Sequence, residues 1–295
     1  MVRKFVAAVN SRTSLNYVIA ATAKNSTNLP KFDIMNLSLE GKNAIICGAS
    51  QGIGFAIAEE LALMGANCIL LARNGENLRI AASQLDISIR QVHSYHTVDF
   101  NDQPKVKELI QKITTSQNIH VLVNNSGGPA AGPIVDATED QFLQAINQHL
   151  IINHILTKAV IEGMKKDGYG RIVNIISTSV KIPLKNLGVS NTTRGAVASW
   201  AKTMANELGQ FGITVNNVLP GFTTTERLKS IIETTARKGN ALIEVVEKNM
   251  MEEVPAKRFG EPSEIAAVAA FLATPAAAYV NGTSIPVDGG RTGSI

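Results

Sequence analysis

The stretch Ala44-Ile-Ile-Cys-Gly-Ala-Ser-Gln-Gly-Ile-Gly54 decides the fold of this chain. The apolar run 44–47 enters a turn that carries glycines at positions 48, 52 and 54, and an amphipathic helical pattern follows. Gly48 permits a tight turn, Gly52 lets backbone approach a pyrophosphate, and Gly54 lets the helix lie close to the sheet. Amides at the helix N-terminus then face the phosphates. The stretch indicates either a dinucleotide site or a plain strand–turn–helix joint, and the rest of the chain must decide.

Strand and helix patterns alternate from residue 44 to the end, with no composition break that marks a second domain. Apolar strands are expected at 44–48, 67–72, 91–98, 119–124, 171–176, 213–219 and 283–287. Helices are expected near 53–64, 75–86, 102–116, 138–166, 190–210, 226–252 and 262–273. This alternation predicts an α/β fold with one doubly wound domain over 37–295, in which a seven-stranded parallel sheet has helices on both faces and right-handed crossovers.

Residues 1–36 form a basic N-terminal extension that carries the net charge of the chain. The whole chain has a formal net charge of +4, and five Lys or Arg against Asp33 give the extension +4 as well. The domain is therefore neutral, and we expect no nucleic-acid partner. Three interpretations fit the extension: an organelle transit peptide, a flexible arm, or an over-long start that precedes Met35.

The apolar runs are too short to span a bilayer, so we expect no membrane partner. Cys47 and Cys68 both fall in expected core strands, which indicates a reduced compartment without a disulfide framework. We expect a cytoplasmic protein, or an organellar one if residues 1–36 are a transit peptide. No His or Cys spacing indicates a metal site.

The second expected strand ends at Arg73, where this fold faces the adenosine ribose. An acid there would bind a 2′-hydroxyl, whereas a guanidinium favours a 2′-phosphate, so we predict NADP(H) over NAD(H). An ordinary solvent-facing arginine is the alternative. Asp99, at the end of the third strand, fits two interpretations equally: an acceptor for an adenine amino group, or a cap for the next helix.

From Leu37 to Gly290 the chain resembles the short-chain dehydrogenase/reductase family, in particular its 3-oxoacyl-acyl-carrier-protein reductase branch. The resemblance rests on motifs in the family's order: 48–54, Asp99, Asn124-Asn-Ser-Gly127, Gly170-Arg-Ile-Val-Asn-Ile175, Gly212-Ile-Thr-Val-Asn216, Pro220-Gly-Phe222, Val254-Pro-Ala-Lys-Arg-Phe-Gly260 and Val287-Asp-Gly-Gly290. It implies a Rossmann-type fold, an oxidoreductase and a nicotinamide cofactor. The expected cofactor-binding residues are Gly48, Ser50, Gln51, Gly52, Ile53, Gly54, Arg73, Asp99, Phe100, Asn125, Gly127, Arg194, Pro220 and Thr223.

The family's catalytic group consists of an Asn, a Ser, a Tyr and a Lys four residues after that Tyr. Ser177 stands at the Ser position, but Ser190 falls on the Tyr position and Arg194 on the Lys position. A serine hydroxyl is a much weaker acid than a phenol, whose pKa is about 10. Arg194 keeps a positive charge and can bond ribose hydroxyls, yet it cannot relay a proton.

His149 falls on the Asn position, although a slip of register would place Asn147 there instead. A histidine has an ordinary pKa near 6.5, so His149 is the best substitute acid if it faces the pocket. A surface or interface histidine is the alternative. None of the tyrosines is placed to reach the C-terminal edge of the sheet, and Lys181 and Lys185 lie in a loop near the expected site.

Two functions follow from this pattern. The first is an NADP(H)-dependent oxidoreductase for a carbonyl or secondary alcohol, with catalytic residues Ser177, Ser190, Arg194 and His149. A long apolar helical segment near 222–253, split at Gly239 and Asn240, suits a lid over a 3-oxoacyl-type or bulky apolar substrate. The second is a catalytically impaired NADP(H)-binding sensor or partner subunit. The resemblance also implies a homodimer or homotetramer.

Overall fold

The computed structural model describes residues 35–294, and from Asn36 onward the described chain forms one compact unit. The interpretations of residues 1–36 and the position of Tyr17 therefore lie outside the described residues, apart from Met35 and Asn36. The strands are β1 (Asn43–Cys47), β2 (Asn67–Ala72), β3 (Ser94–Thr97), β4 (Val121–Asn124), β5 (Gly170–Ile175), β6 (Ile213–Pro220) and β7 (Ser284–Val287). They form one sheet in the order β3-β2-β1-β4-β5-β6-β7, and every neighbouring pair is parallel.

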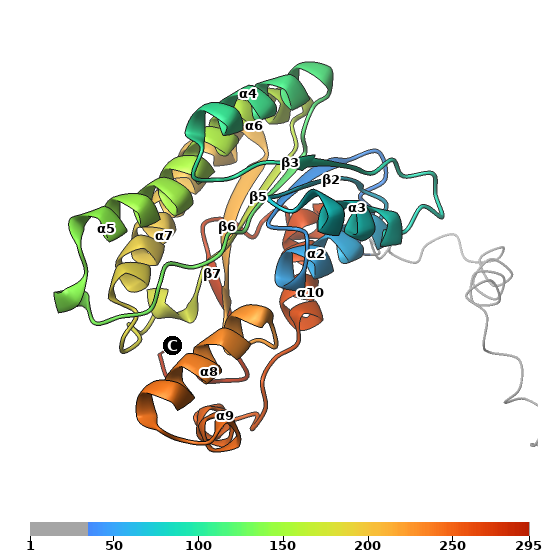
Figure 1. Cartoon of the computed structure of the whole chain (residues 1–295). Coiled ribbons are helices and arrows are strands. Elements are labelled where there is room, and N and C mark those ends of the chain that lie inside the picture. Colours follow the sequence, from blue (N-terminus) through green and yellow to red (C-terminus); the bar gives the residue numbers. More distant parts are fainter. Residues whose placement is uncertain (1–34, 295) are drawn as a thin grey trace, which may run out of the picture. The chain divides into compact units, whose positions relative to one another are not determined.

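The helices follow the strands in alternation (Figure 1). The α-helices are α2 (Gly52–Leu63), α3 (Gly75–Gln84), α4 (Gln103–Ser116), α5 (Glu139–Ile146), α6 (Ile152–Asp167), α7 (Gly188–Leu208), α8 (Glu226–Gly239), α9 (Ile243–Glu252) and α10 (Pro262–Ala273). A π-helical turn, η3 (Asn147–Ile151), joins α5 to α6, and short 3₁₀ turns are η2 (Ile134–Asp136), η4 (Thr178–Val180), η5 (Gly209–Phe211) and η6 (Pro275–Ala277). The predicted seven-stranded parallel sheet with helices on both faces is confirmed.

Two apolar clusters cover the two faces of the sheet. On one face, Ile57 of α2, Leu78 of α3 and Ala269 of α10 belong to a single buried cluster. On the other face, side chains of α4, α6 and α7 pack together against the opposite sides of the same strands. Successive strand residues alternate between the clusters, as the period of a strand requires. Burial on both faces explains why the central strands read as continuous apolar runs.

The connection from β6 to β7 has the opposite hand to its neighbours. Connections through α2 and α3 run from β1 towards β3 on one face, while those through α6 and α7 run from β4 towards β6 on the other. α10 also connects in the direction of β7, yet it packs on the face of α2 (Figure 1). The prediction of right-handed crossovers throughout is therefore wrong for this last connection. The detour through α8 and α9 lets the chain change faces before α10 begins.

Three element boundaries differ from the sequence-based expectation. β3 begins at Ser94 rather than 91, because Gln91 and Val92 bond to Ala62 and Asn67 instead of extending the ladder. The single helix expected over 138–166 is interrupted by the π-helical turn η3. The segment 226–252 divides as expected, since Asn240 adopts the left-handed conformation with a φ of 46° after α8 ends at Gly239.

Buried asparagines form a hydrogen-bonded ladder across the middle of the sheet. Asn124 of β4 donates to Asn174 of β5 at 2.8 Å, and Asn174 donates to Asn217 of β6 at 2.9 Å. Asn217 in turn donates to Ser284 of β7 at 3.0 Å. A buried amide is costly without a partner, so each member of this ladder depends on the next. The ladder fixes the register of the strands whose ends carry the candidate site.

We expect Asn174→Ala to lower the free energy of unfolding by about 2–4 kcal/mol, since it removes two buried hydrogen bonds and leaves amide groups of both neighbours unpaired. Urea denaturation followed by circular dichroism measures the change. The control is Asn249→Ala on the exposed face of α9, with an expected change of less than about 0.5 kcal/mol. Equal stability of the two variants would contradict a structural role for the ladder.

Candidate active site

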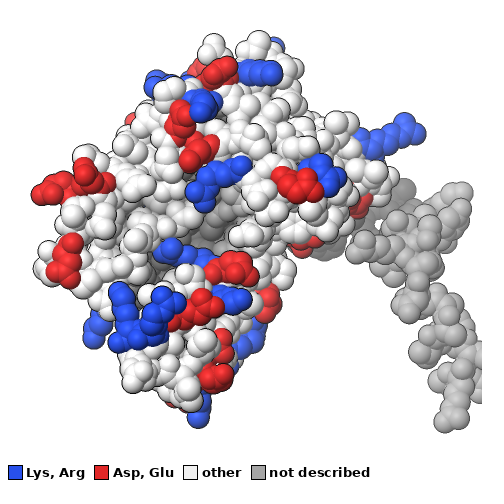
Figure 2. Space-filling model, in the orientation of Figure 1, with Lys and Arg blue, Asp and Glu red and all other residues white. Residues whose placement is uncertain are grey.

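A cleft of about 830 Å³ lies at the C-terminal ends of the strands. One side is formed by the loops that follow β1, β2, β4 and β5, and the other by Phe222 and the first turns of α8. Figure 2 shows this hollow between the body of the sheet and the α8–α9 segment, with basic side chains at its edge. A cleft at this edge of a doubly wound sheet is where such folds bind their ligands.

The glycine turn between β1 and α2 has the geometry of a cradle for phosphate. Gly48 and Gly52 have φ angles of 62° and 59°, which side-chain-bearing residues rarely adopt. A β-carbon on Gly54 would lie 2.2 Å from the carbonyl oxygen of Gly48, so helix and strand can meet only at a glycine. The Asn125 amide closes the turn by donating to the carbonyls of Cys47 and Gly48 at 3.2 and 3.4 Å. These residues fit a dinucleotide, whose pyrophosphate would accept hydrogen bonds from the first amides of α2.

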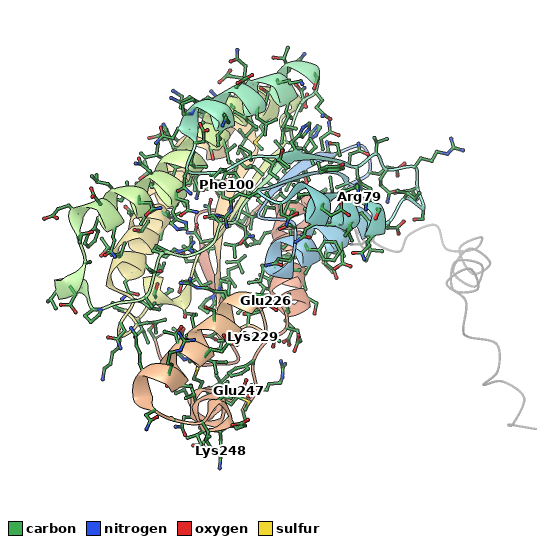
Figure 3. The ribbon with its side chains drawn as sticks, in the orientation of Figure 1. Arg79, Phe100, Glu226, Lys229, Glu247 and Lys248 are labelled. Carbon is green, nitrogen blue, oxygen red and sulfur yellow. The ribbon has the colours of Figure 1, made fainter. Side chains whose placement is uncertain are left out.

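The end of the cleft at β2 and β3 has the groups expected for an adenosine. Arg73 lies exposed at the end of β2 and lines the cleft together with Asp99 and Phe100. Figure 3 labels Phe100. The Asp99 carboxylate accepts hydrogen bonds from the backbone and side chain of Asn101 at 2.9 and 3.0 Å. The N-cap of α4 is Asp102, not Asp99. Asp99 therefore shapes the turn after β3 while it faces the cleft.

Ser177 and Ser190 both line the cleft. Ser177 follows β5 and its hydroxyl oxygen accepts a hydrogen bond from the Ser179 amide at 3.1 Å. Because that oxygen already accepts a bond, the hydroxyl proton remains available to donate. Ser190 lies in the first turns of α7 and is half-buried. None of the tyrosines within residues 35–294 lines the cleft, and Tyr169 donates its hydroxyl to the Ala273 carbonyl at 2.6 Å instead.

Arg194 lies one helical turn after Ser190 and is 7% exposed. Its Nη1 donates to the Ile175 carbonyl at 3.1 Å, while its Nε is buried without a partner in the described part of the chain. No described carboxylate lies within 4.0 Å of this guanidinium. Burial, with a smaller contribution from the charge of Arg227, lowers the pKa of Arg194 to about 10. The side chain therefore stays positively charged at neutral pH.

His149 lies in the π-helical turn and is 1% exposed. Its Nδ1 shares a hydrogen bond of 2.7 Å with the Ser126 hydroxyl, which lines the cleft, whereas His149 itself does not line it. Burial, together with the charges of Arg194 and Arg227, lowers the pKa of His149 to about 3. The expectation of a pocket-facing imidazole with an ordinary pKa near 6.5 is therefore wrong. His149 is a neutral side chain behind the wall of the cleft.

The structure also decides between the two registers for this helix. Asn147 is exposed and accepts a hydrogen bond from the Gln103 amide at 3.2 Å, on the outer surface. His149 is thus the member of this pair that points towards the site. A π-helical turn widens the helix locally and is frequent at functional sites. Lys181 and Lys185 are exposed and do not line the cleft.

Nearly all of the residues expected at the site from sequence line one cleft. The exceptions are Gly54, which packs beneath the glycine turn, and His149. Sequence reasoning missed Arg227 of α8, whose Nη2 donates to the Pro129 carbonyl at 2.6 Å. A signal for it was present, because a cation in the first turn of a helix opposes the helix dipole and indicates another role.

Comparison with known proteins agrees with the fold and the glycine cradle. The family model described as enoyl-(acyl carrier protein) reductase matches residues 48–292. The chain belongs to the short-chain dehydrogenase/reductase family. It is 34% identical over 258 residues to the 3-oxoacyl-[acyl-carrier-protein] reductase of Vibrio cholerae, with 86% of this chain and 98% of that protein covered. Members of this family are NAD(P)-dependent oxidoreductases that act on carbonyl or alcohol groups.

Solved structures of other family members are similar throughout the domain. L-sorbose reductase from Gluconobacter frateurii, complexed with NADPH and L-sorbose, has a TM-score of 0.83 at 28% identity, over 88% of this chain and 100% of that one. A gluconate 5-dehydrogenase from Burkholderia cenocepacia, in complex with NADP and tartrate, has a TM-score of 0.78 at 27% identity, over 88% and 99% of the two chains.

Residues 35–294 contain neither a metal-binding cluster nor a membrane-spanning helix. No cluster of three or more His, Cys, Asp or Glu side chains has the arrangement of a metal site. None of the helices in the same range combines the length and the apolar character that crossing a bilayer requires.

The low pKa of His149 predicts a pH dependence of stability. The folded pKa of about 3 lies below the ordinary value of 6.5. The stability that the native state gains from keeping His149 neutral is therefore fully present above pH 6.5 and is lost as the pH falls towards 3. Each pH unit in that window costs the native state about 1.4 kcal/mol. We expect His149→Asn to flatten the fall in the free energy of unfolding between about pH 6 and about pH 4.

Urea denaturation at a series of pH values measures this slope for the wild type and for His149→Asn. Replacement of the exposed helical His154 by Asn is the control for loss of an imidazole. Parallel curves for the wild type and His149→Asn would contradict a buried neutral imidazole.

Proposed function

We propose that this chain is an NADP(H)-dependent oxidoreductase whose active site is Ser177, Ser190 and Arg194, with His149 as a positioning residue. The observation that carries the proposal is that these three residues line the same continuous cleft as the glycine cradle. When bound, the reduced nicotinamide supplies a hydride to a substrate carbonyl carbon, and a proton completes the alcohol. The family supports this chemistry, while the roles of the individual residues belong to the proposal.

Ser177 polarises the substrate oxygen in this mechanism. Its hydroxyl oxygen is already engaged by the Ser179 amide, so its proton points to whichever acceptor enters the cleft. Arg194 holds the ribose hydroxyls and places a fixed positive charge near the oxygen on which negative charge develops. Such preorganised charge is effective because it needs no reorganisation during the reaction.

The proton comes from solvent water in this proposal. Ser190 is too weak an acid, Arg194 remains charged, and His149 is neutral and lies behind Ser126. Ser190 is much smaller than a tyrosine, which leaves space for water beside the substrate oxygen. His149 instead holds Ser126 and keeps this part of the wall in position.

Arg73 supports the preference for NADP(H). Its guanidinium is exposed at the end of β2, and no described carboxylate lies within 4.0 Å of it. Asp99 and Glu226 are the acidic residues of the cleft lining, and neither lies at the end of β2. A 2′-phosphate at this position would gain a charge-assisted hydrogen bond that a 2′-hydroxyl would not.

The substrate-binding half of the cleft supports a ketone with an apolar body, such as a 3-oxoacyl compound. Leu184 and Leu187 line it from the loop before α7, and Leu228 and Ile231 line it from α8. We assign α8 and α9 to the substrate lid over 222–253. Arg227 connects this segment to the loop after β4 through its hydrogen bond to Pro129.

A homodimer or homotetramer and a cytoplasmic location complete the proposal. Leu143 on α5 is 59% exposed and Val135 in η2 is 87% exposed, which supports contact of this region with a second copy. Trp200 already packs within its own chain, because its ring contacts His154 edge-on.

We expect NADPH to bind the purified chain and ketones to be reduced, with Ser177→Ala lowering kcat by about 100-fold or more and leaving the Kd for NADPH unchanged. Calorimetry measures binding, and NADPH oxidation with a panel of ketones and 3-oxoacyl thioesters measures turnover. Tight NADPH binding without turnover across the panel would favour a sensor or partner subunit. Failure to bind either nucleotide would exclude both functions.

We expect Arg73→Glu to weaken NADPH binding about 10- to 100-fold while changing NADH binding much less, because the lost contact serves the 2′-phosphate. The matched control is Arg79→Glu on α3, which carries the same charge change but does not line the cleft (Figure 3). An equal effect of both variants would reduce the role of Arg73 to general electrostatics.

A further inference from the structure

Two arginines from different elements converge on one part of the cleft. Arg194 comes from α7 beneath the cleft, and Arg227 comes from the first turn of α8 above it. A β-carbon placed on Gly128 would lie 3.7 Å from Nη2 of Arg194 and 3.4 Å from Nη2 of Arg227. The two guanidinium groups therefore border the same small volume beside Gly128.

These two positive charges have no counter-ion in the described part of the chain. Neither guanidinium lies within 4.0 Å of a carboxylate from residues 35–294. Arg194 is buried with its Nε unpartnered in the described residues. Arg227 is more exposed, and partial desolvation lowers its pKa. Arg291, also in the lining, differs because Glu253 binds it at 2.6 Å and its guanidinium stacks on Phe222 at 4.0 Å. Arg194 and Arg227 thus form a cationic pair that is open to the cleft.

The local backbone adds to the positive potential. Arg227 is the second residue of α8, where the unpaired amides of a helix N-terminus already favour an anion. Glu226 precedes it but is exposed and makes no ion pair with it. Figure 3 places Glu226 and Lys229 on this same helix. A site with two guanidinium groups and no fixed anion is complementary to an oxyanion.

The pyrophosphate of the cofactor has a different place. Its expected cradle is the turn 48–54, and the residue near that turn is Thr225, the N-cap of α8, whose Cγ2 lies 3.5 Å from a β-carbon placed on Gly52. Arg227 instead reaches Pro129, in the loop after β4. The cationic pair therefore faces the part of the cleft that Ser177, Leu184 and Leu187 also line, where the substrate is expected.

We propose that the substrate carries a carboxylate or an equivalent oxyanion, which Arg227 and Arg194 bind together. This inference rests on the proposed function and narrows its substrate class to oxo acids or hydroxy acids. The apolar side chains of the loop before α7 and of α8 contact the carbon chain, and the oxyanion lies beside Gly128. Arg227 is the specificity-determining residue, because it belongs to the lid segment and brings its charge to the substrate.

The first test measures anion binding without any reaction, and it uses the full chain loaded with NADP⁺. Thermal unfolding is followed with acetoacetate, malonate or inorganic phosphate, at constant ionic strength set with chloride. We expect the carboxylates to raise Tm in the wild type and in Lys229→Gln, but not in Arg227→Gln. Lys229 is a matched control because it is an exposed cation on the same helix that does not line the cleft. A response to phosphate without one to the carboxylates would assign the site to phosphorylated substrates.

The second test compares acetoacetate with its neutral methyl ester as substrates for NADPH oxidation. We expect Arg227→Gln to raise KM for the acid about 10- to 100-fold, with KM for the ester and Kd for NADPH unchanged. A Tm that rises with the anion, without any turnover, would support the anion site and contradict the proposed reductase activity. The inference is overturned if no oxyanion raises Tm more than chloride does. It is also overturned if Arg227→Gln weakens NADPH binding and changes KM for the acid and KM for the ester by the same factor.

Discussion

The unpaired positive charge of Arg194 is the constraint on which the rest of this site depends. The guanidinium is 7% exposed and makes one hydrogen bond, to the Ile175 carbonyl, with no carboxylate beside it in the described residues. Burial of a cation without a partner is costly, so the folded chain gains stability from any ligand that supplies acceptor oxygens. Ribose hydroxyls and a substrate oxyanion are both ligands of this kind.

The neighbours of Arg194 are consistent with that constraint. A protonated imidazole at position 149 would add a third positive charge beside Arg194 and Arg227, and these two charges contribute to keeping His149 neutral. The neutral ring binds Ser126 and supports the wall of the cleft. Ser190, in place of a bulkier phenol, leaves the guanidinium of Arg194 accessible from the cleft. In the proposed mechanism these residues act through positive charge and polarisation rather than through a side-chain acid.

The sequence predicted the fold because its signals are local. Buried strands in alternation with helices, and a glycine turn that tolerates no β-carbon at Gly54, are both readable from neighbouring residues. The reversed hand of the last crossover depends on which face α10 packs against, and that is decided by contacts with α2. The pKa of His149 depends in the same way on burial and on two arginines distant in sequence. The place of Arg227 in the site depends on the position of α8 over the cleft, which the local sequence does not indicate.

We propose that hydride transfer proceeds here without a tyrosine among the described residues of the cleft. A single-turnover experiment tests it most directly: the chain is loaded with NADPH and mixed with excess acetoacetate, and the absorbance of the reduced nicotinamide is followed. We expect an exponential loss of that absorbance, which is slower when the transferred hydrogen of NADPH is replaced by deuterium. Unchanged absorbance, with calorimetry showing both ligands bound, would contradict it and leave a binding protein without hydride chemistry.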